Sequence, residues 1–208
     1  MKKIVLLILL FIGFIFLNAR FINSFGVKGG LVVSNQDFDY KYVNSDMQNL
    51  TRFDIGLFLE LLRNSNLNIL AEFHYVQKGM IYEINNYDDN GNYLGMLELK
   101  NHAEYITLQI FGKFAYNLKK SSPYIIMGPR IDFLTGYYCE NNLFDSVYED
   151  FKSFDFGATF GIGFEFRYYK SQAFLFEMRF SPSFTNSYET ESLTVKNNSF
   201  EFLTGIKF

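Results

Sequence analysis

The 208-residue chain contains no tryptophan, one cysteine, three prolines and two histidines, and its formal net charge is only -3. The single cysteine, Cys139, excludes an internal disulfide framework and a zinc site made of several cysteines, so we expect a free surface thiol. Three prolines are too few for long disordered linkers. No long basic run is present, so nucleic-acid binding has little support.

The longest apolar run of the chain is short for a transmembrane helix. Lys2 and Lys3 precede a run over residues 4–17, which is shorter than the about 20 residues that a spanning helix needs. Basic residues, a short apolar core and a following small residue predict a signal peptide over residues 1–24, cleaved after Ala19 or Ser24. An uncleaved membrane anchor is the alternative, and in both cases the rest of the chain leaves the cytoplasm.

Aromatic residues are abundant, because the chain contains 26 Phe and 15 Tyr, and aromatic residues favour strands. After the first segment, no part of the chain has the 3.6-residue period of a helix. Eight segments alternate between apolar and polar residues, which predicts strands with two unlike faces. These predicted strands cover residues 25–34, 51–62, 67–78, 102–116, 122–134, 153–167, 172–184 and 197–208.

The connections between the predicted strands alternate between long and short without exception. The short connections, which have turn composition, are 63–66, 117–121 and 168–171. The long connections, which are polar, are 35–50, 79–101, 135–152 and 185–196. Such segregation of loop length is typical of outer-membrane barrels. We therefore predict an all-β fold, an eight-stranded antiparallel up-and-down transmembrane β-barrel over residues 25–208, integral to the outer membrane.

Each predicted strand separates apolar residues from charged residues. In the seventh strand, for example, Phe174, Phe176 and Met178 alternate with Glu177 and Arg179. Both signs of charge occur on the polar face in near balance, so we expect these side chains to pair inside a closed lumen. The predicted lumen charge network consists of Lys28, Asp54, Glu60, Glu72, His74, Lys113, Arg130, Asp132, Asp155, Glu165, Arg167, Glu177, Arg179, Glu201 and Lys207.

The alternation alone does not distinguish a barrel with an apolar outer wall from a soluble lipocalin-like barrel with an apolar interior. Two features favour the membrane barrel. The sequence ends in a predicted strand at Phe208, and we expect this terminal aromatic residue to bind the barrel assembly machinery. Glycines on the charged face would also leave room for long side chains that cross a narrow lumen. They are Gly30, Gly56, Gly128, Gly157, Gly161, Gly163 and Gly205.

Short motifs follow one another in order along the predicted barrel. They are "FGVKGGLVVS" in the first strand, "YITLQIFGKFAY" in the fourth, and "YIIMGPR", "FGIGFEF" and "FEMRFS" in later strands. Together they resemble the PorT-like outer-membrane β-barrel domain family, which is common in Bacteroidetes, over Phe25 to Phe208. Gln109 stands where that family usually has proline. The resemblance implies the fold and an outer-membrane location, and some family members are linked to secretion machinery.

The two histidines are the first candidates for chemistry. We expect His74 to face the lumen near Glu72 and Lys78 and to belong to the charge network. A barrel hydrolase with His74 as the base would need a nucleophile and an orienting acid beside the ring, and no serine lies in its predicted strand. We expect His102 to be solvated at a loop edge.

Three other patterns are assigned to structure rather than to chemistry. "GIGFEF" lacks the third glycine and the following helix of a dinucleotide-binding loop. "DDNGN" at 88–92 lacks the spaced carboxylates and final Glu of an EF-hand loop, and a solvated turn is expected. Tyrosines near strand ends are predicted to form girdles at the membrane interfaces, namely Tyr75, Tyr105, Tyr116, Tyr124, Tyr168 and Tyr169.

These observations favour a non-enzymatic integral outer-membrane protein that has long extracellular loops and a surface binding or structural role. The alternatives are an accessory component of an outer-membrane protein secretion machine and an outer-membrane lipid hydrolase that uses the His74 region. We expect no catalytic residue, cofactor or metal. The expected partners are outer-membrane lipid, the assembly machinery at Phe208 and a protein at the long loops.

Overall fold

The computed structural model describes residues 22–40, 43–44, 47–64, 66–118, 120–141, 144–169 and 172–208. Residues 1–21, which include most of the predicted signal peptide, lie outside this part of the chain. Within it, no helix is both long enough and apolar enough to cross a membrane.

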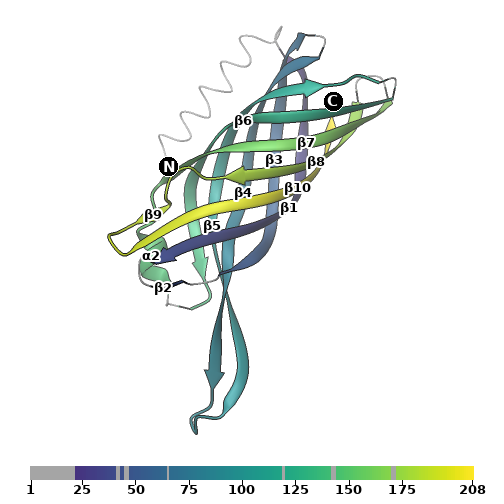
Figure 1. The fold of residues 1–208 in the computed structure, drawn as a ribbon. Coiled ribbons are helices and arrows are strands. Elements are labelled where there is room, and N and C mark those ends of the chain that lie inside the picture. The colour runs from purple at the N-terminus through teal and green to yellow at the C-terminus, as the bar shows by residue number, and fades with distance from the viewer. Residues whose placement is uncertain are drawn as a thin grey trace.

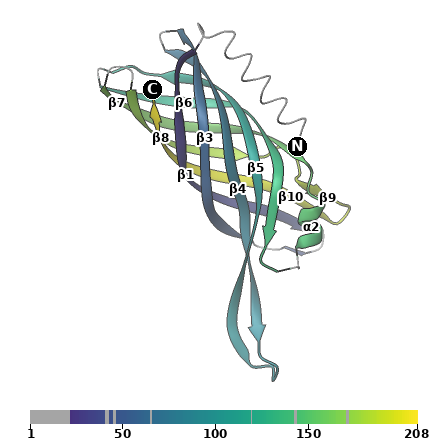
Figure 2. The same ribbon diagram turned by 180° about the vertical axis from the view of Figure 1, so that it is seen from behind.

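Eight long antiparallel strands form a closed ring (Figure 1, Figure 2). The last strand pairs with the first from Gly26↔Lys207 to Tyr40↔Leu193, so the ring has no free edge along the barrel wall. This closure confirms the predicted up-and-down barrel, and it pairs the backbone groups as a lipid environment requires. The strands are β1 (Ile22–Tyr40), β3 (Gln48–Asn64), β4 (Leu67–Tyr87), β5 (Tyr93–Ala115), β6 (Ser121–Cys139), β7 (Phe154–Tyr169), β8 (Gln172–Pro182) and β10 (Leu193–Lys207).

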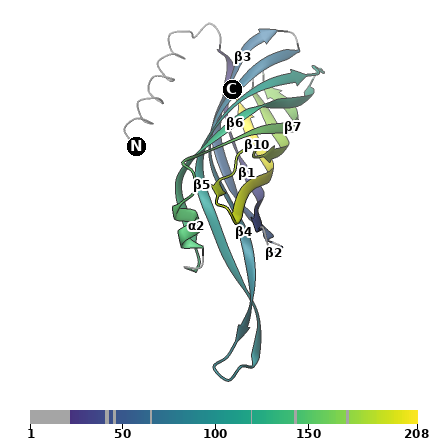
Figure 3. The same ribbon diagram turned by 60° about the vertical axis from the view of Figure 1, so that its left-hand side comes forward.

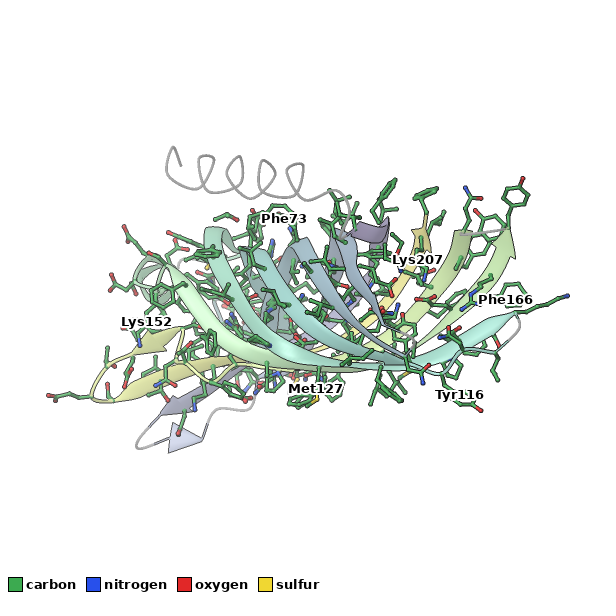
Figure 4. All side chains as sticks on the ribbon, turned by 90° about the horizontal axis from the view of Figure 1, so that it is seen from above. Phe73, Tyr116, Met127, Lys152, Phe166 and Lys207 are labelled. Atoms are coloured by element: carbon green, nitrogen blue, oxygen red, sulfur yellow. The ribbon has the colours of Figure 1, made fainter. Side chains whose placement is uncertain are left out.

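The two ends of the barrel differ, as the loop lengths predict. We call the end with the short connections, where β1 begins and β10 ends, the turn end, and the opposite end the loop end. In Figure 4, Tyr116 and Phe166 mark the turn end and Lys152 marks the loop end. The loop end also holds two short strands and one short helix, β2 (Val43–Asn44), β9 (Tyr188–Glu189) and α2 (Asp145–Glu149).

The predicted long connection over residues 79–101 is largely strand in the structure. Residues 79–101, expected as a loop, continue β4 and β5 into a hairpin that projects far beyond the other strands (Figure 3). Its tip is closed by Asp88, whose carboxylate accepts hydrogen bonds from the backbone N–H groups of Asn90 and Asn92, and by Gly91 with a φ of 80°. Backbone pairing does not depend on an apolar pattern, so the strands continue where the apolar alternation weakens.

The apolar face of every long strand points outward. Ile55, Leu57 and Met178 are 59%, 59% and 53% exposed, and Figure 4 shows Phe73 and Met127 on the outer wall. Monomeric soluble proteins rarely carry an apolar surface that encircles the molecule. The outer wall is therefore suited to lipid, and the soluble lipocalin-like arrangement, with its apolar interior and charged exterior, does not describe this chain.

Candidate functional site

His74 lies at the centre of the lumen between two carboxylates. Its Nδ1 is 2.5 Å from Oδ1 of Asp54 and its Nε2 is 2.9 Å from Oε2 of Glu72, and all three side chains are fully buried. A neutral imidazole has only one N–H, whereas an imidazolium can donate to both carboxylates. The geometry therefore fits a charged His74, because both ring nitrogens lie within ion-pair distance of a carboxylate oxygen.

Two further cations, Lys28 and Arg179, lie beside the Glu72 carboxylate. Nζ of Lys28 lies 2.5 Å from Glu72 and 2.7 Å from Glu177, and Arg179 reaches Glu72 at 2.8 Å and also pairs with Glu177. The Tyr124 hydroxyl donates to Glu177 over 2.5 Å. Buried charges are tolerated when each has partners of opposite sign, and this cluster meets that requirement.

A second cluster lies nearer the loop end. Nζ of Lys78 is 2.6 Å from Oδ2 of Asp132, and Nε of Arg130 is 3.1 Å from the same oxygen. Asp155 accepts hydrogen bonds from hydroxyl groups, including that of Ser183 at 2.6 Å. The Ser183 hydroxyl in turn accepts a hydrogen bond of 2.9 Å from Arg130. Arg130 and Ser183 therefore link Asp132 to Asp155.

A third cluster closes the turn end. Glu60 and Glu165 share the ammonium groups of Lys113 and Lys207. Glu60 also accepts a hydrogen bond of 2.9 Å from Ser24, near the start of β1. Since Lys207 ends β10, these contacts tie the first and last strands of the ring together.

The structure places most of the predicted network residues inside the barrel. Lys207 is partly exposed at the turn end, and so is Arg167, which contacts Asn117 and Ser122 instead of a carboxylate. The predicted network residues whose side chains are buried in the lumen are Lys28, Asp54, Glu60, Glu72, His74, Lys113, Arg130, Asp132, Asp155, Glu165, Glu177, Arg179 and Glu201.

Two assignments from the sequence, one for Lys78 and one for His102, are wrong. Lys78 pairs with Asp132 of β6 rather than lying beside His74, because residues four apart on one strand are about 13 Å apart, whereas long side chains of different strands meet inside the lumen. His102 is buried rather than solvated, since its ring packs beside Tyr138 at 5.5 Å between ring centres.

The predicted tyrosine girdle is also wrong at two positions. Tyr105 and Tyr124 are buried in the lumen, at 1% and 4% exposure. Both share the inward parity of their strands, a signal that was present in the sequence. Tyr116, Tyr168 and Tyr169 are exposed at the turn end, as a girdle requires, and Tyr75 is partly exposed.

Sequence reasoning missed an apolar layer inside the barrel. It lies between the central charge cluster and the turn end, and its aromatic rings contact cations of both neighbouring clusters. Nζ of Lys28 lies 4.7 Å from the ring centre of Phe58, and Nζ of Lys113 lies 4.5 Å from that of Tyr124. The layer consists of Phe58, Leu70, Phe111, Ala115, Tyr124, Ile126 and Leu175.

The α2 segment fills the loop end of the lumen. Phe144 packs against Phe38 and Tyr82 with ring centres 5.5 and 5.3 Å away, and Tyr148 stacks on Phe151 at 4.6 Å. The buried Tyr148 hydroxyl donates to Gln36 of β1. We call this group the cap; its buried residues are Phe38, Met47, Met80, Ala103, Tyr105, Phe144, Tyr148, Phe151, Leu193 and Val195.

Among the described residues, no hydroxyl or thiol forms a hydrogen bond with His74, and no cluster of three metal-ligating side chains is found. A hollow of about 810 Å³ lies near the turn end, but most of its lining side chains belong to the outer wall, such as Ile125, Ile162 and Phe176. The hollow therefore faces the lipid side of the barrel.

Comparison with known proteins agrees with this geometry. Residues 22–189 match the model of a family described as outer membrane protein beta-barrel domain. No curated protein sequence matches the chain.

Several solved structures are similar. Neisserial surface protein A is 9% identical, with 88% of this chain and 95% of that chain covered at a TM-score of 0.48. OprG from Pseudomonas aeruginosa is 11% identical, with 90% and 97% covered at 0.45. Ail of Yersinia pestis, solved with the heparin analogue sucrose octasulfate, is 13% identical, with 89% and 98% covered at 0.44.

The family model spans most of the chain, including seven of the eight long strands in full. Short connections of outer-membrane barrels are periplasmic and long ones are extracellular, so the turn end is periplasmic and the loop end is extracellular. The chain belongs to the outer membrane protein β-barrel domain family and is an integral protein of the outer membrane.

Proposed function

We propose that this protein is a non-enzymatic outer-membrane barrel whose lumen is closed and whose extracellular end binds a partner at the cell surface. The observation that carries the proposal is the filling of the lumen by successive layers. From the extracellular to the periplasmic end, the layers are the cap, the second and central charge clusters, the apolar layer and the third charge cluster. Eight strands enclose only enough space for such side chains.

The pairing within the lumen supports the absence of a transport pathway. Glu72 has three cationic neighbours, His74, Lys28 and Arg179, each within 3 Å. A solute or ion would have to break these buried pairs in order to pass, and breaking one buried pair costs about 3–5 kcal/mol.

The surroundings of His74 support a non-enzymatic role. A hydrolase base must accept a proton from a nucleophile, and both ring nitrogens of His74 already face carboxylate oxygens. The residue is fully buried beneath the cap, so a substrate has no route to the ring.

The extracellular end supports the binding role, because it carries the parts of the chain that extend beyond the barrel wall. The β4–β5 hairpin exposes Tyr93, Leu94 and Met96 at 55%, 62% and 65%. Large exposed apolar side chains beyond the membrane are characteristic of interaction surfaces.

Two measurements test the proposal. In planar lipid bilayers, the purified barrel should produce no stable conductance steps, and steps with a defined open level would contradict a closed lumen. In whole cells, a photo-cross-linking residue at Tyr93 should form a protein adduct, whereas one at the lipid-facing Phe164 should not. An adduct from the periplasmic Tyr116 alone would favour the secretion-machine alternative instead.

A further inference from the structure

The outer part of the β4–β5 hairpin is a two-stranded ribbon with two unpaired edges. The last residue of β4 that pairs with β3 is Ile81, opposite Gln48, and the last residue of β5 that pairs with β6 is Asn101, opposite Cys139. Beyond these positions, Tyr82↔Leu99 to Tyr87↔Tyr93 pair only with each other among the described residues. At about 3.3 Å per residue, the six residues of β4 in the ribbon give it a length of about 20 Å. The ribbon projects beyond the other strands of the barrel (Figure 1, Figure 3).

A ribbon of two strands is marginally stable in water by itself. Each free edge presents a row of backbone N–H and C=O groups that can pair with another extended chain. The wall of the barrel holds the base of the ribbon in place, so an added strand would extend an existing sheet. Strand addition to such an edge is a known mode of peptide recognition.

The cross-strand pairs of the ribbon alternate in character. Tyr82 lies opposite Leu99, Glu83 opposite Glu98, and Ile84 opposite Leu97. The two apolar pairs lie on the face that continues the lumen side, where Tyr82 meets the cap residue Phe144. The two carboxylates lie on the other face.

The Glu83↔Glu98 pair is unfavourable in the isolated ribbon, because like charges directly opposite each other destabilise a sheet. Glu98 is 3.5 Å from Lys100, but no ion pair involves Glu83 in the described part of the chain. A cation added beside this pair would relieve the repulsion.

The charge of the whole ribbon has one sign. Its charged residues are Glu83, Asp88, Asp89 and Glu98, and residues 82–99 contain no Lys or Arg. A second copy of this chain would bring the same acidic residues to the same edge, so the charges disfavour self-pairing and favour a basic partner.

We infer that the ribbon binds an extended, cationic polypeptide segment as a third strand, and that the segment alternates apolar and basic residues. Period two places its basic residues on the same face as Glu83 and Glu98 and its apolar residues on the same face as the Ile84 and Leu97 pair. This inference rests on the proposed surface-binding function and specifies the chemistry of the partner.

The test uses the full chain in lipid nanodiscs and four fluorescent nine-residue peptides. The first alternates Val and Lys, the second alternates Val and Glu, the third has the first peptide's composition in two blocks, and the fourth is the first peptide with N-methyl groups on alternate residues. Binding is measured by fluorescence anisotropy. Only the alternating Val–Lys peptide should bind tightly, since N-methylation removes the backbone donors while keeping the charge.

The carboxylates are tested by the double substitution Glu83→Gln and Glu98→Gln. It should weaken binding of the Val–Lys peptide about five-fold and reduce its salt dependence. The matched control is Glu149→Gln with Glu191→Gln, two exposed acids on other extracellular connections, which should leave the affinity unchanged. Heat-modifiable migration confirms that each variant is folded.

Equal binding of the N-methylated and unmodified Val–Lys peptides would overturn strand addition. An equal loss of peptide affinity in the ribbon variant and in the control variant would overturn the assignment of the site to the ribbon. If no peptide binds but Tyr93 still forms a cross-link in cells, the cationic partner is wrong while the surface role stands. If no extracellular position forms a cross-link, the surface role itself is wrong.

Discussion

The ring of His74 on β4 occupies the space where Gly56 on β3 would carry a side chain. A Cβ atom built on Gly56 would lie 2.4 Å from Cγ of His74, much closer than carbon atoms approach in proteins. The ring has no freedom to move aside, because Asp54 and Glu72 hold its two nitrogens. The missing side chain at Gly56 therefore fixes the position of the central charge cluster.

Replacing this glycine should destabilise the barrel. We expect Gly56→Ala to lower the free energy of unfolding by about 1–3 kcal/mol, the usual cost of overpacking a buried site. Urea unfolding of the protein in lipid vesicles measures the loss. The control is Gly112→Ala on the outer wall, where the nearest atom to a new Cβ is 3.9 Å away. Equal losses in the two variants would contradict this packing argument.

The buried ion pairs should matter far more than the exposed ones. Arg179→Met removes the guanidinium that pairs with Glu72 and Glu177 and leaves two buried carboxylates with fewer partners. We expect a loss of about 3–5 kcal/mol in the same unfolding measurement. The control, Lys152→Met, removes an exposed pair with Glu189 and should change stability by less than about 1 kcal/mol. A small effect of Arg179→Met would show that the lumen is hydrated rather than closed.

The sequence predicts the barrel well because its strongest signals are periodic. Parity alone places Asp54, Glu72 and His74 on one face, since side chains alternate along every strand. Parity does not give the register between strands that are distant in sequence. The contact between Lys28 and Glu177, which joins β1 to β8 through the lumen, therefore could not be read from the chain.

The errors have two separate physical causes. The position of Tyr105 and Tyr124 near strand ends predicts the membrane interface, whereas their parity points inward, where the structure buries them. The cap was missed because α2 has only five residues, too few to show a helical period, and because Tyr148 is buried by strands from distant parts of the chain.

The cap should be a local unit that opens without unfolding the barrel. Tyr148→Ala removes the buried ring that stacks on Phe151 and donates to Gln36. We expect the backbone amides of residues 144–151 to lose most of their protection against hydrogen exchange, while the β-strands keep theirs. Tyr116→Ala, which truncates a tyrosine that is 63% exposed at the turn end, serves as the control. Loss of protection throughout the barrel would mean that the cap and the wall form one cooperative unit.

The chemical reactivity of the Cys139 thiol offers a second test of the cap, because reagents reach it from the extracellular side. Burial of the thiol and its hydrogen bond to Asp145 raise the pKa of Cys139 from 9.0 to about 12. A raised pKa means that the folded protein binds this proton more tightly than the unfolded chain does. The contribution of Cys139 to the free energy of unfolding is therefore present below pH 9 and is lost as the pH rises toward 12.

Because the thiolate is the reactive form, modification of Cys139 should be slow near neutral pH. We expect the rate of reaction with a small disulfide reagent to rise about ten-fold per pH unit up to pH 10 without levelling off. Asp145→Asn removes the carboxylate that disfavours the thiolate, so this variant should react several-fold faster at pH 8. Asp150→Asn, an exposed acid just after α2, is the matched control and should react as the unmodified protein does. A rate that levels off below pH 9 would mean that the cap does not shield Cys139, because an unshielded thiol titrates near its ordinary pKa.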